Sequence, residues 1–225
     1  MGHFAFEHWF AVRILVVTAT DMEIAPFVAA LRDSPRHAVE VLTTGVGMVA
    51  TAVRCSRALA QARYDLALNF GVCGSFDPAL GPGTVVHVVA DRLAELGAED
   101  GDAFLTIQQL HLLEDDAFPF RGGQLVNVSP PASATLDGLP AVSGITVNTV
   151  HGDDRSIARV TRRFNPQVES MEGAAFMYAC LVDEVPFAQV RAVSNVVATR
   201  NRDAWRMADA IANLGRTAVR ILETL

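Results

Sequence analysis

The residues Arg13-Ile-Leu-Val-Val-Thr-Ala19 form a continuous apolar run that is rich in β-branched side chains. Such a run is typical of a strand buried on both faces, as in a parallel sheet that helices cover on each side. Thr20 and Asp21 follow at once, and both are good N-cap residues for a helix from about Met22 to Leu31. The stretch therefore predicts a buried strand that turns directly into a helix, with Glu23 at the corner.

Strand and helix patterns alternate along the rest of the chain. Residues 97–133 are rich in acids, glycines and prolines, which predicts loops with at most one short element. We expect an α/β fold: a single-domain three-layer αβα arrangement around a central, mixed but mostly parallel, twisted sheet. Residues 1–11 are expected to be an N-terminal extension, and residues 12–225 the domain. Further strands are predicted over residues 39–44, 66–70, 84–90, 144–150 and 187–194, and further helices over 48–62, 172–181 and 205–225.

Composition limits the classes of function. Hydrophobic residues make up 51% of the chain, which predicts a substantial core, and the net charge of −7 argues against a broad nucleic-acid or anionic-membrane surface. No apolar run reaches the roughly 20 residues that a membrane helix needs. Cys55, Cys73 and Cys180 are far apart and odd in number, so neither a disulfide framework nor a metal site is expected. These features favour a cytoplasmic protein that binds a small molecule and needs no cofactor.

Two acids stand at predicted corners between strand and helix. Since ligands collect outside the carboxyl ends of parallel strands, the corners at Glu23, at residues 71–75, at 170–172 and at 194–195 should lie together. Glu23 can act as a general base on water, although a first-turn glutamate stabilised by the helix dipole is the simpler interpretation. Glu172, with Met171 beside it, opens a helix of small residues, so both can face a ligand above the sheet; an exposed first-turn acid is the alternative.

Other candidates lie on glycine-rich or polar segments. Residues 71–75, Gly-Val-Cys-Gly-Ser, predict a tight turn whose backbone, at Gly71 above all, can approach an anion or a sugar. Cys73 is expected to be a packed thiol rather than a nucleophile. Asn195 offers amide donors and an acceptor without ionising, so it can read a heterocycle edge but cannot supply a proton as an acid. Trp205 can cover a sugar or an aryl group, or simply anchor the last helix.

Five segments, in this order, resemble the nucleoside phosphorylase and nucleosidase superfamily. The combination of residues 168–176 with Ser194-Asn195 and residues 200–203 is most similar to the futalosine hydrolases within it. The resemblance implies a homo-oligomer, a dimer or a tetramer, that hydrolyses futalosine to hypoxanthine and dehypoxanthine futalosine on a route to menaquinone. The five segments are residues 20–23 (TDME), 44–47 (TGVG), 69–75 (NFGVCGS), 170–175 (SMEGAA) and 191–195 (RAVSN).

The resemblance also implies roles for particular residues. The N-glycosidic bond of a purine nucleoside breaks through an oxocarbenium-like ribosyl cation, by analogy with other glycosidic reactions. By similarity to the methylthioadenosine nucleosidases, Glu23 activates the water, Glu172 binds ribose hydroxyls and Arg191 helps to hold the water. Ser194 matches a residue that orients the purine-binding side chain.

The sequence departs from those nucleosidases at two positions. They have an aspartate at the position of Asn195 and a serine at that of Val72. An asparagine can donate to N7 or O6, and trimeric purine nucleoside phosphorylases, which prefer 6-oxopurines, also use one, so Asn195 favours hypoxanthine as the leaving base. Val72 lacks the hydroxyl and thus favours hydrolysis over phosphorolysis. Arg200 or Arg202 is expected to meet the benzoate of futalosine.

Three alternatives stay open at this point. A methylthioadenosine or adenosylhomocysteine nucleosidase would want the aspartate that Asn195 replaces, and a purine nucleoside phosphorylase would need a phosphate site. A non-catalytic nucleoside-binding protein is the alternative from another class, but the presence of both Glu23 and Glu172 argues against it.

Overall fold

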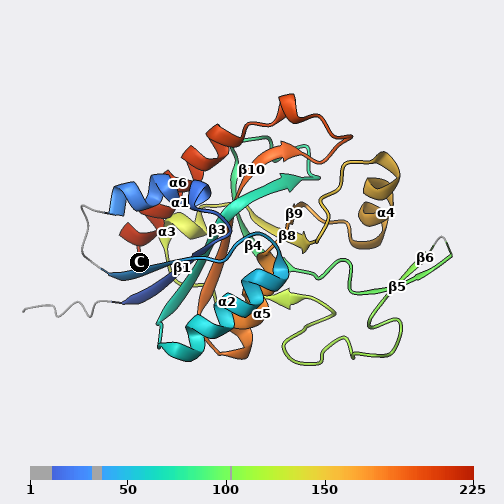
Figure 1. Cartoon of the computed structure of the whole chain (residues 1–225), viewed down its shortest axis with the longest axis horizontal. Helices are drawn as coiled ribbons and strands as arrows, with labels where there is room; N and C mark the ends of the chain where they lie inside the picture. The colour runs from blue at the N-terminus through green and yellow to red at the C-terminus, as the bar shows by residue number, and fades with distance from the viewer. Residues whose placement is uncertain (1–11, 32–36, 102) are drawn as a thin grey trace, which may run out of the picture.

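The computed structural model describes residues 12–31, 37–101 and 103–225 (Figure 1). The predicted extension, residues 1–11, lies outside the described residues. A mixed α/β domain with one central sheet is observed, which confirms the predicted fold class.

The central sheet has eight strands and is mostly parallel. β1 (Arg13–Thr18) lies between β2 (Ala38–Thr43) and β3 (Leu66–Ser75), and all three run parallel. β10 (Phe187–Val196) continues the parallel order on the other side of β3. Five of the six residues of β1 are fully buried, as expected of a strand covered on both faces.

The sheet closes on itself beyond β10. β4 (Val85–Asp91) runs antiparallel to β10 and parallel to β8 (Ala141–Thr146), and the two-residue β7 (Leu125–Val126) pairs with β4. β9 (Val168–Ser170) is parallel to β8 and antiparallel to the last residues of β3. The strands β3, β10, β4, β8 and β9 therefore form a closed ring, which the sequence did not predict.

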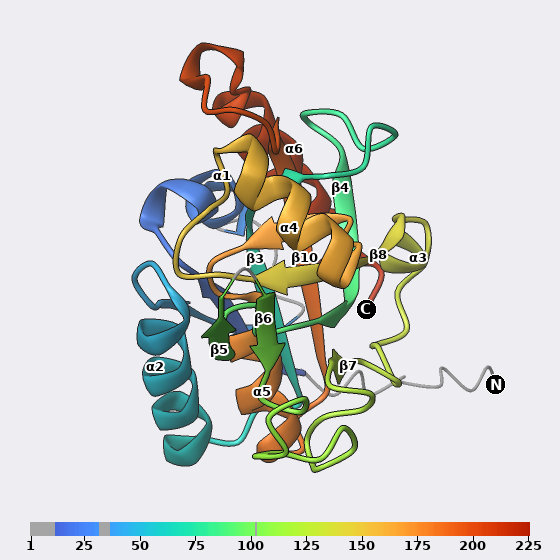
Figure 2. The ribbon, with the colours of Figure 1, turned by 90° about the vertical axis from the view of Figure 1, so that its right-hand side faces the viewer.

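Helices cover the sheet on two sides (Figures 1 and 2). α1 (Asp21–Leu31) and the C-terminal α6 (Met207–Glu223) pack together on one side, beside the short α3 (Ala134–Asp137). α2 (Met48–Gln61) and α5 (Gly173–Val182) pack together on the other. Each layer buries its own apolar cluster against the sheet, one around Phe27 and Phe70 and one around Phe176 and Phe187.

Three parts of the structure differ from the prediction. No turn interrupts residues 71–75, because β3 continues to Ser75 with β10 paired along one side and β9 on the other. The first part of residues 97–133 forms a hairpin, β5 (Gly97–Asp100) and β6 (Ala103–Thr106), which projects from the domain in Figure 1. The third difference is α4 (Asp154–Phe164), which lies outside every predicted element, and the 3-10 turn η1 (Arg202–Ala204) completes the fold.

Candidate active site

A cleft of about 270 Å³ opens at the carboxyl ends of β1, β3, β9 and β10. These are the strands whose ends were predicted to meet, so the sheet brings together residues that lie far apart in the sequence. Apolar side chains make up most of its walls. It is lined by Ala19, Thr20, Met22, Glu23, Val46, Val72, Cys73, Gly74, Val150, Glu169, Ser170, Met171, Glu172, Ser194, Asn195, Trp205 and Met207.

Glu23 lies in the first turn of α1 and forms a capping box with Thr20. The Thr20 backbone N and Oγ1 donate to Glu23 Oε2 at 3.0 and 2.8 Å, and Glu23 N donates to Thr20 Oγ1 at 3.4 Å. Val72 N donates to Glu23 Oε1 at 3.1 Å. A carboxylate has about four lone-pair sites. Three are occupied, so Oε1 keeps one further acceptor site in a buried side chain that lines the cleft.

Glu172 is the N-cap residue of α5 and is buried at the same cleft. Its Oε1 accepts from Gly47 N at 3.0 Å, and its Oε2 lies 3.5 Å from Arg191 Nη1. The exposed first-turn acid that the sequence left open is therefore wrong for Glu172. Met171 precedes it and also lines the cleft.

Arg191 lies behind the cleft wall and does not line it. Its side chain is 1% exposed, and it donates from Nε to Gln189 Oε1 at 3.2 Å and from Nη2 to Asn69 Oδ1 at 2.5 Å. A Cβ on Gly71 would collide with Arg191 Nη1 and would lie 3.3 Å from Glu23 Oε1. Gly71 thus gives room to the guanidinium and the carboxylate, which is a different role from the predicted turn.

Asn195 also lines the cleft, at a point where a register shift interrupts the pairing of β10 with β3. Its Oδ1 accepts from Ser194 Oγ at 2.8 Å, and Ser194 Oγ also lies 3.1 Å from the Cys73 carbonyl oxygen. The Asn195 Nδ2 group donates to the Val196 carbonyl at 3.1 Å. Since Ser194 takes the amide oxygen and Val196 takes one N–H, one N–H donor remains on Nδ2.

Three residues predicted to contact the substrate, Arg200, Arg202 and Trp205, differ in their positions relative to the cleft. Trp205 lines the cleft, and the guanidinium carbon of Arg200 lies 5.4 Å from the centre of a Trp205 ring. Arg200 and Arg202 are both exposed, and neither lines the cleft itself. Arg200 therefore lies next to the cleft, because it contacts the cleft residue Trp205, whereas Arg202 lies in the 3-10 turn.

Cys73 lines the cleft but is a packed thiol, as predicted. It is buried, and burial raises the pKa of its thiol to about 12, so the nucleophilic thiolate is not populated near neutral pH. Within residues 12–31, 37–101 and 103–225, no group of three side chains could hold a metal ion.

Two buried acids near this site were not predicted from the sequence. Glu169 lines the cleft and pairs with His151, and Asp91 accepts from Gln189 Nε2 at 3.1 Å. Burial raises the pKa of Asp91 to about 6. The sequence contained one usable signal, since Glu169 stands within residues 168–176, the segment that already carried the resemblance to the superfamily.

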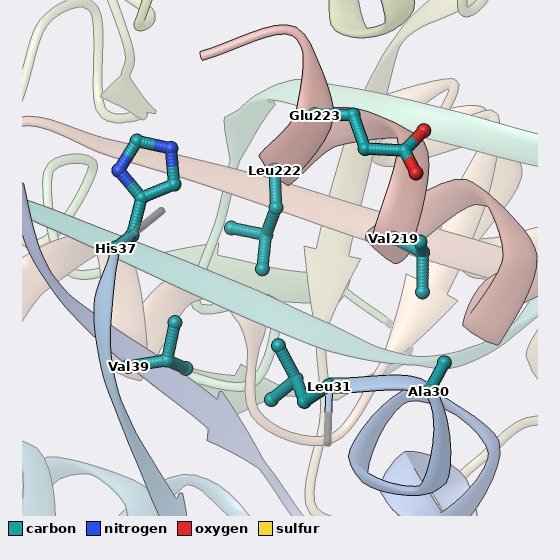
Figure 3. A pocket seen from close by; sticks show the side chains of 7 residues that line it. All are labelled: Ala30, Leu31, His37, Val39, Val219, Leu222 and Glu223. Carbon is teal, nitrogen blue, oxygen red and sulfur yellow. The ribbon is translucent and has the colours of Figure 1, made fainter. Parts of the chain in front are cut away.

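A second hollow lies between α1, β2 and α6 and is too small for a nucleoside. Its volume is about 30 Å³, which is room for a water molecule or two. Figure 3 shows that mainly aliphatic side chains surround it, with His37 and Glu223 at its edges.

Across the described residues, no helix is long and apolar enough to cross a membrane.

The chain is similar to known proteins over most of its length. The family model described as the phosphorylase superfamily matches residues 33–225. The futalosine hydrolase of Thermus thermophilus is 32% identical, over 80% of this chain and 80% of its own. A 5'-methylthioadenosine/S-adenosylhomocysteine nucleosidase of Geobacillus kaustophilus is 27% identical, over 69% of this chain and 66% of its own.

A solved structure extends the similarity to the fold. The native structure of futalosine hydrolase from Helicobacter pylori superposes with a TM-score of 0.76 at 13% identity, covering 96% of this chain and 99% of that one. At that identity the match is evidence of the fold alone. Since the family model spans residues 33–225 and a relative matches at 32% identity, the chain belongs to the phosphorylase superfamily.

Proposed function

We propose that this protein hydrolyses the N-glycosidic bond of futalosine and releases hypoxanthine. One observation carries the proposal: the Asn195 amide oxygen is taken by Ser194, which leaves an N–H donor in a cleft that also contains Glu23 and Glu172. A donor there suits O6 or N7 of a 6-oxopurine. The identity of 32% to a futalosine hydrolase supports the same substrate.

Glu23 acts as the general base. Its Oε1 has an acceptor site left on the wall of the cleft, and Arg191 Nη1 fills the place beside it that a Cβ on Gly71 would take. A water in the cleft can donate one proton to Glu23 Oε1, and the nearby Arg191 guanidinium helps to hold the oxygen of that water. Glu23 takes the proton as the water oxygen bonds to C1′ of the ribose, and the electrons of the broken C–N bond leave with the base. The departing base then takes a proton from solvent water to give hypoxanthine, and Glu23 returns its proton to the solvent.

Glu172 binds the ribose hydroxyls. Its carboxylate is fixed by Gly47 N and Arg191, so it is already oriented before substrate enters. A buried carboxylate beside the ribose also stabilises the positive charge that develops on the sugar ring in the transition state. Arg191 compensates its charge in the free enzyme.

Asn195, with Met171 and Trp205, holds the base and the distal part of the substrate. The amide donates to the departing purine, which carries negative charge as the bond breaks, and a hydrogen-bond donor at that place favours its departure. Arg200, stacked on Trp205 at the rim, is the cation that we assign to the benzoate carboxylate.

The decisive experiment offers the purified protein futalosine, inosine and 5′-methylthioadenosine, each with and without phosphate, and identifies the released base. We expect hypoxanthine from futalosine, at a rate independent of phosphate. Release of adenine from methylthioadenosine at a comparable rate would instead assign the protein to the adenine-specific nucleosidases. A strict need for phosphate would make it a phosphorylase, and binding without turnover a nucleoside-binding protein.

We further propose that the protein is a homo-oligomer, through the face that α2 and α5 form. Val49 and Val53 on α2 are 73% and 63% exposed, and Tyr178 on α5 is 40% exposed. A hollow of about 260 Å³ lies between the two helices. Val46, at the mouth of the cleft, is 57% exposed and extends the same apolar surface.

The buried, unpaired state of all three cysteines fits a reducing, cytoplasmic compartment.

A further inference from the structure

A buried acid and histidine lie beside the cleft and have no part in the reaction as proposed. His151 N donates to Glu169 Oε1 at 3.0 Å, and His151 Nδ1 lies 2.6 Å from Glu169 Oε2. The side chain of Glu169 is 3% exposed, and that of His151 is 14% exposed. Burying a carboxylate is costly even when it is paired, so a role in function is a reasonable cause for keeping it.

Strand pairing puts Glu169 in line with Asn195. β3 pairs with β10 on one side, where Gly74 is opposite Asn195, and with β9 on the other, where Gly74 is opposite Glu169. A Cβ on Gly74 would lie 2.8 Å from Val197 Cγ2, 3.4 Å from Asn195 Nδ2 and 3.5 Å from Glu169 Cγ. The amide and the carboxylate side chain therefore stand on the same face of the sheet, on either side of a residue without a side chain, and all three residues line the cleft.

The pair offers the cleft a donor next to an acceptor. His151 occupies two of the roughly four lone-pair sites of the carboxylate, so Glu169 can still accept. Asn195 presents an N–H, because Ser194 binds its oxygen. A 6-oxopurine has the matching groups on adjacent atoms, an acceptor at O6 and a donor at N1–H. Adenine has the reverse order, an amino donor at position 6 and an acceptor at N1.

We propose that Glu169, oriented by His151, accepts the N1–H of a 6-oxopurine base and so determines which base the enzyme releases. The inference rests on the proposed function and deepens it. Against an adenine nucleoside, the carboxylate would face the lone pair of N1 and the Asn195 N–H would face the amino group. Unpaired groups of that kind in a buried site reject the wrong base strongly.

The test compares futalosine with its 6-amino analogue, in the wild-type protein and in Glu169→Gln. The variant is isosteric, and a neutral His151 can change tautomer to accept from the new amide, so the contact between them persists. We expect kcat/KM on futalosine to fall about 10- to 100-fold, the usual effect of losing a hydrogen bond to a charged group. We expect kcat/KM on the 6-amino analogue to stay the same or rise. The ratio of the two substrates therefore shifts toward adenine.

Two further variants make the result specific. Glu172→Gln, the matched change in another cleft carboxylate, should lower kcat/KM on both substrates by similar factors, because both carry the same ribose. His151→Ala leaves the Glu169 charge but removes its side-chain partner, and should shift the ratio in the same direction as Glu169→Gln by a smaller factor. His151→Ala also tests the proposal if the Glu169→Gln variant does not fold.

Failure of the inference and failure of the proposed function give different results. If the wild-type protein does not release hypoxanthine from futalosine, the proposed function is wrong. If the wild-type protein does so, and the substrate ratio is unchanged in Glu169→Gln and in His151→Ala, then only the role of Glu169 is overturned.

Discussion

Glu23 uses the same carboxylate to cap a helix and to line the cleft. Its contacts with Thr20 belong to the fold, since they satisfy N–H and hydroxyl donors at the start of α1. Its contact with Val72 N ties it to β3. The two interpretations that the sequence allowed, a first-turn glutamate and a catalytic base, are thus compatible. The start of the helix fixes the position of the carboxylate, and its location in the cleft lets the same carboxylate accept a proton from a water.

Gly71 gives the sharpest prediction at the scale of a single residue. In Gly71→Ala the new methyl group meets Arg191 Nη1, and Arg191 is held by three partners and cannot move freely. We expect kcat to fall at least about 100-fold, since an error of about 1 Å in a catalytic group costs that much. Gly81→Ala is the matched control, because no atom lies within 4 Å of its new Cβ. Steady-state kinetics of both variants check this, and equal activities would contradict it.

Arg200 and Arg202 form a matched pair on one loop. Both are exposed, but only Arg200 stacks on Trp205. Arg200→Ala should raise the KM for futalosine about 10-fold, the order of magnitude for a hydrogen bond between charged groups, and should leave inosine hydrolysis nearly unchanged. Arg202→Ala should affect neither. An equal loss on futalosine and inosine in Arg200→Ala would argue against a carboxylate contact.

At the scale of the elements, a chain of buried polar side chains on neighbouring strands positions Arg191, a group of the proposed catalytic site. Asp91 at the end of β4 accepts from Gln189 on β10, and Gln189 in turn accepts from Arg191 Nε. A carboxylate cannot donate, so it obliges Gln189 to present its oxygen to Arg191. Thr146 on β8 donates to Asp91 and accepts from Ala174 N at the start of α5. The chain therefore links three strands with the helix that Glu172 caps.

Asp91→Asn tests this chain of contacts. The new amide can donate a hydrogen bond to the Gln189 side-chain oxygen. The Gln189 side chain then presents its N–H group to Arg191 Nε, which is also a donor, and we expect kcat/KM to fall about 10-fold. The folded pKa of Asp91, about 6, lies above the unfolded value of 3.8, so its contribution to stability is fully present below 3.8 and is lost as the pH rises through 6. At pH 7 the charged form therefore costs up to about 3 kcal/mol.

The variant should accordingly be no less stable than the wild type at pH 7, although it is less active. Thermal unfolding at pH 7 and at pH 4, together with kinetics, checks this. A variant that loses stability at pH 7 and keeps its activity would show that Asp91 serves only the fold.

At the scale of the whole molecule, one buried histidine makes stability depend on pH. Burial lowers the pKa of His87 to about 4 from 6.5, and in the described part of the chain its Nε2 has no hydrogen-bond partner. The unfolded chain takes up a proton below pH 6.5, whereas the folded chain does so only near pH 4. Stability is therefore lost as the pH falls between these values, by about 2 kcal/mol at pH 5.

His87→Leu removes this loss. Urea unfolding at pH 7 and pH 5 should give a smaller drop in the free energy of unfolding for the variant than for the wild type. Equal drops in the two proteins would mean that His87 is protonated in the folded state near its ordinary pKa.

The apolar face of α2 makes a prediction about assembly. A second copy packed there would cover Val49 and Val53, so Val53→Glu should weaken association because it buries an unpaired charge. Light scattering after size-exclusion chromatography should give a lower mass for this variant than for the wild type at the same concentration. Val128→Glu is the control, since Val128 is 57% exposed and lies just after β7, outside both α2 and α5. If light scattering gives the wild-type protein the mass of one chain, the proposed homo-oligomer is wrong.

Much of the architecture was determined by the sequence alone. The apolar run of β1, the N-cap at Thr20 and the alternation of strands and helices act over a few residues, and local hydrophobic periodicity and capping encode them directly. They also place the acids Glu23 and Glu172 at the carboxyl ends of strands, where the structure has them. The amide character of Asn195, and with it the expected preference for a 6-oxopurine, is a property of one side chain.

Only the tertiary structure decided how these residues are held. β3 continues through Gly71 and Gly74 because β9 and β10 supply hydrogen bonds from distant parts of the chain, and a local pattern of glycines cannot reveal such partners. The pairing of Glu169 with His151 and the chain from Asp91 to Arg191 likewise join residues on separate strands. Closure of the sheet brings them together, since long-range pairing sets which buried polar groups meet and what each can still donate or accept.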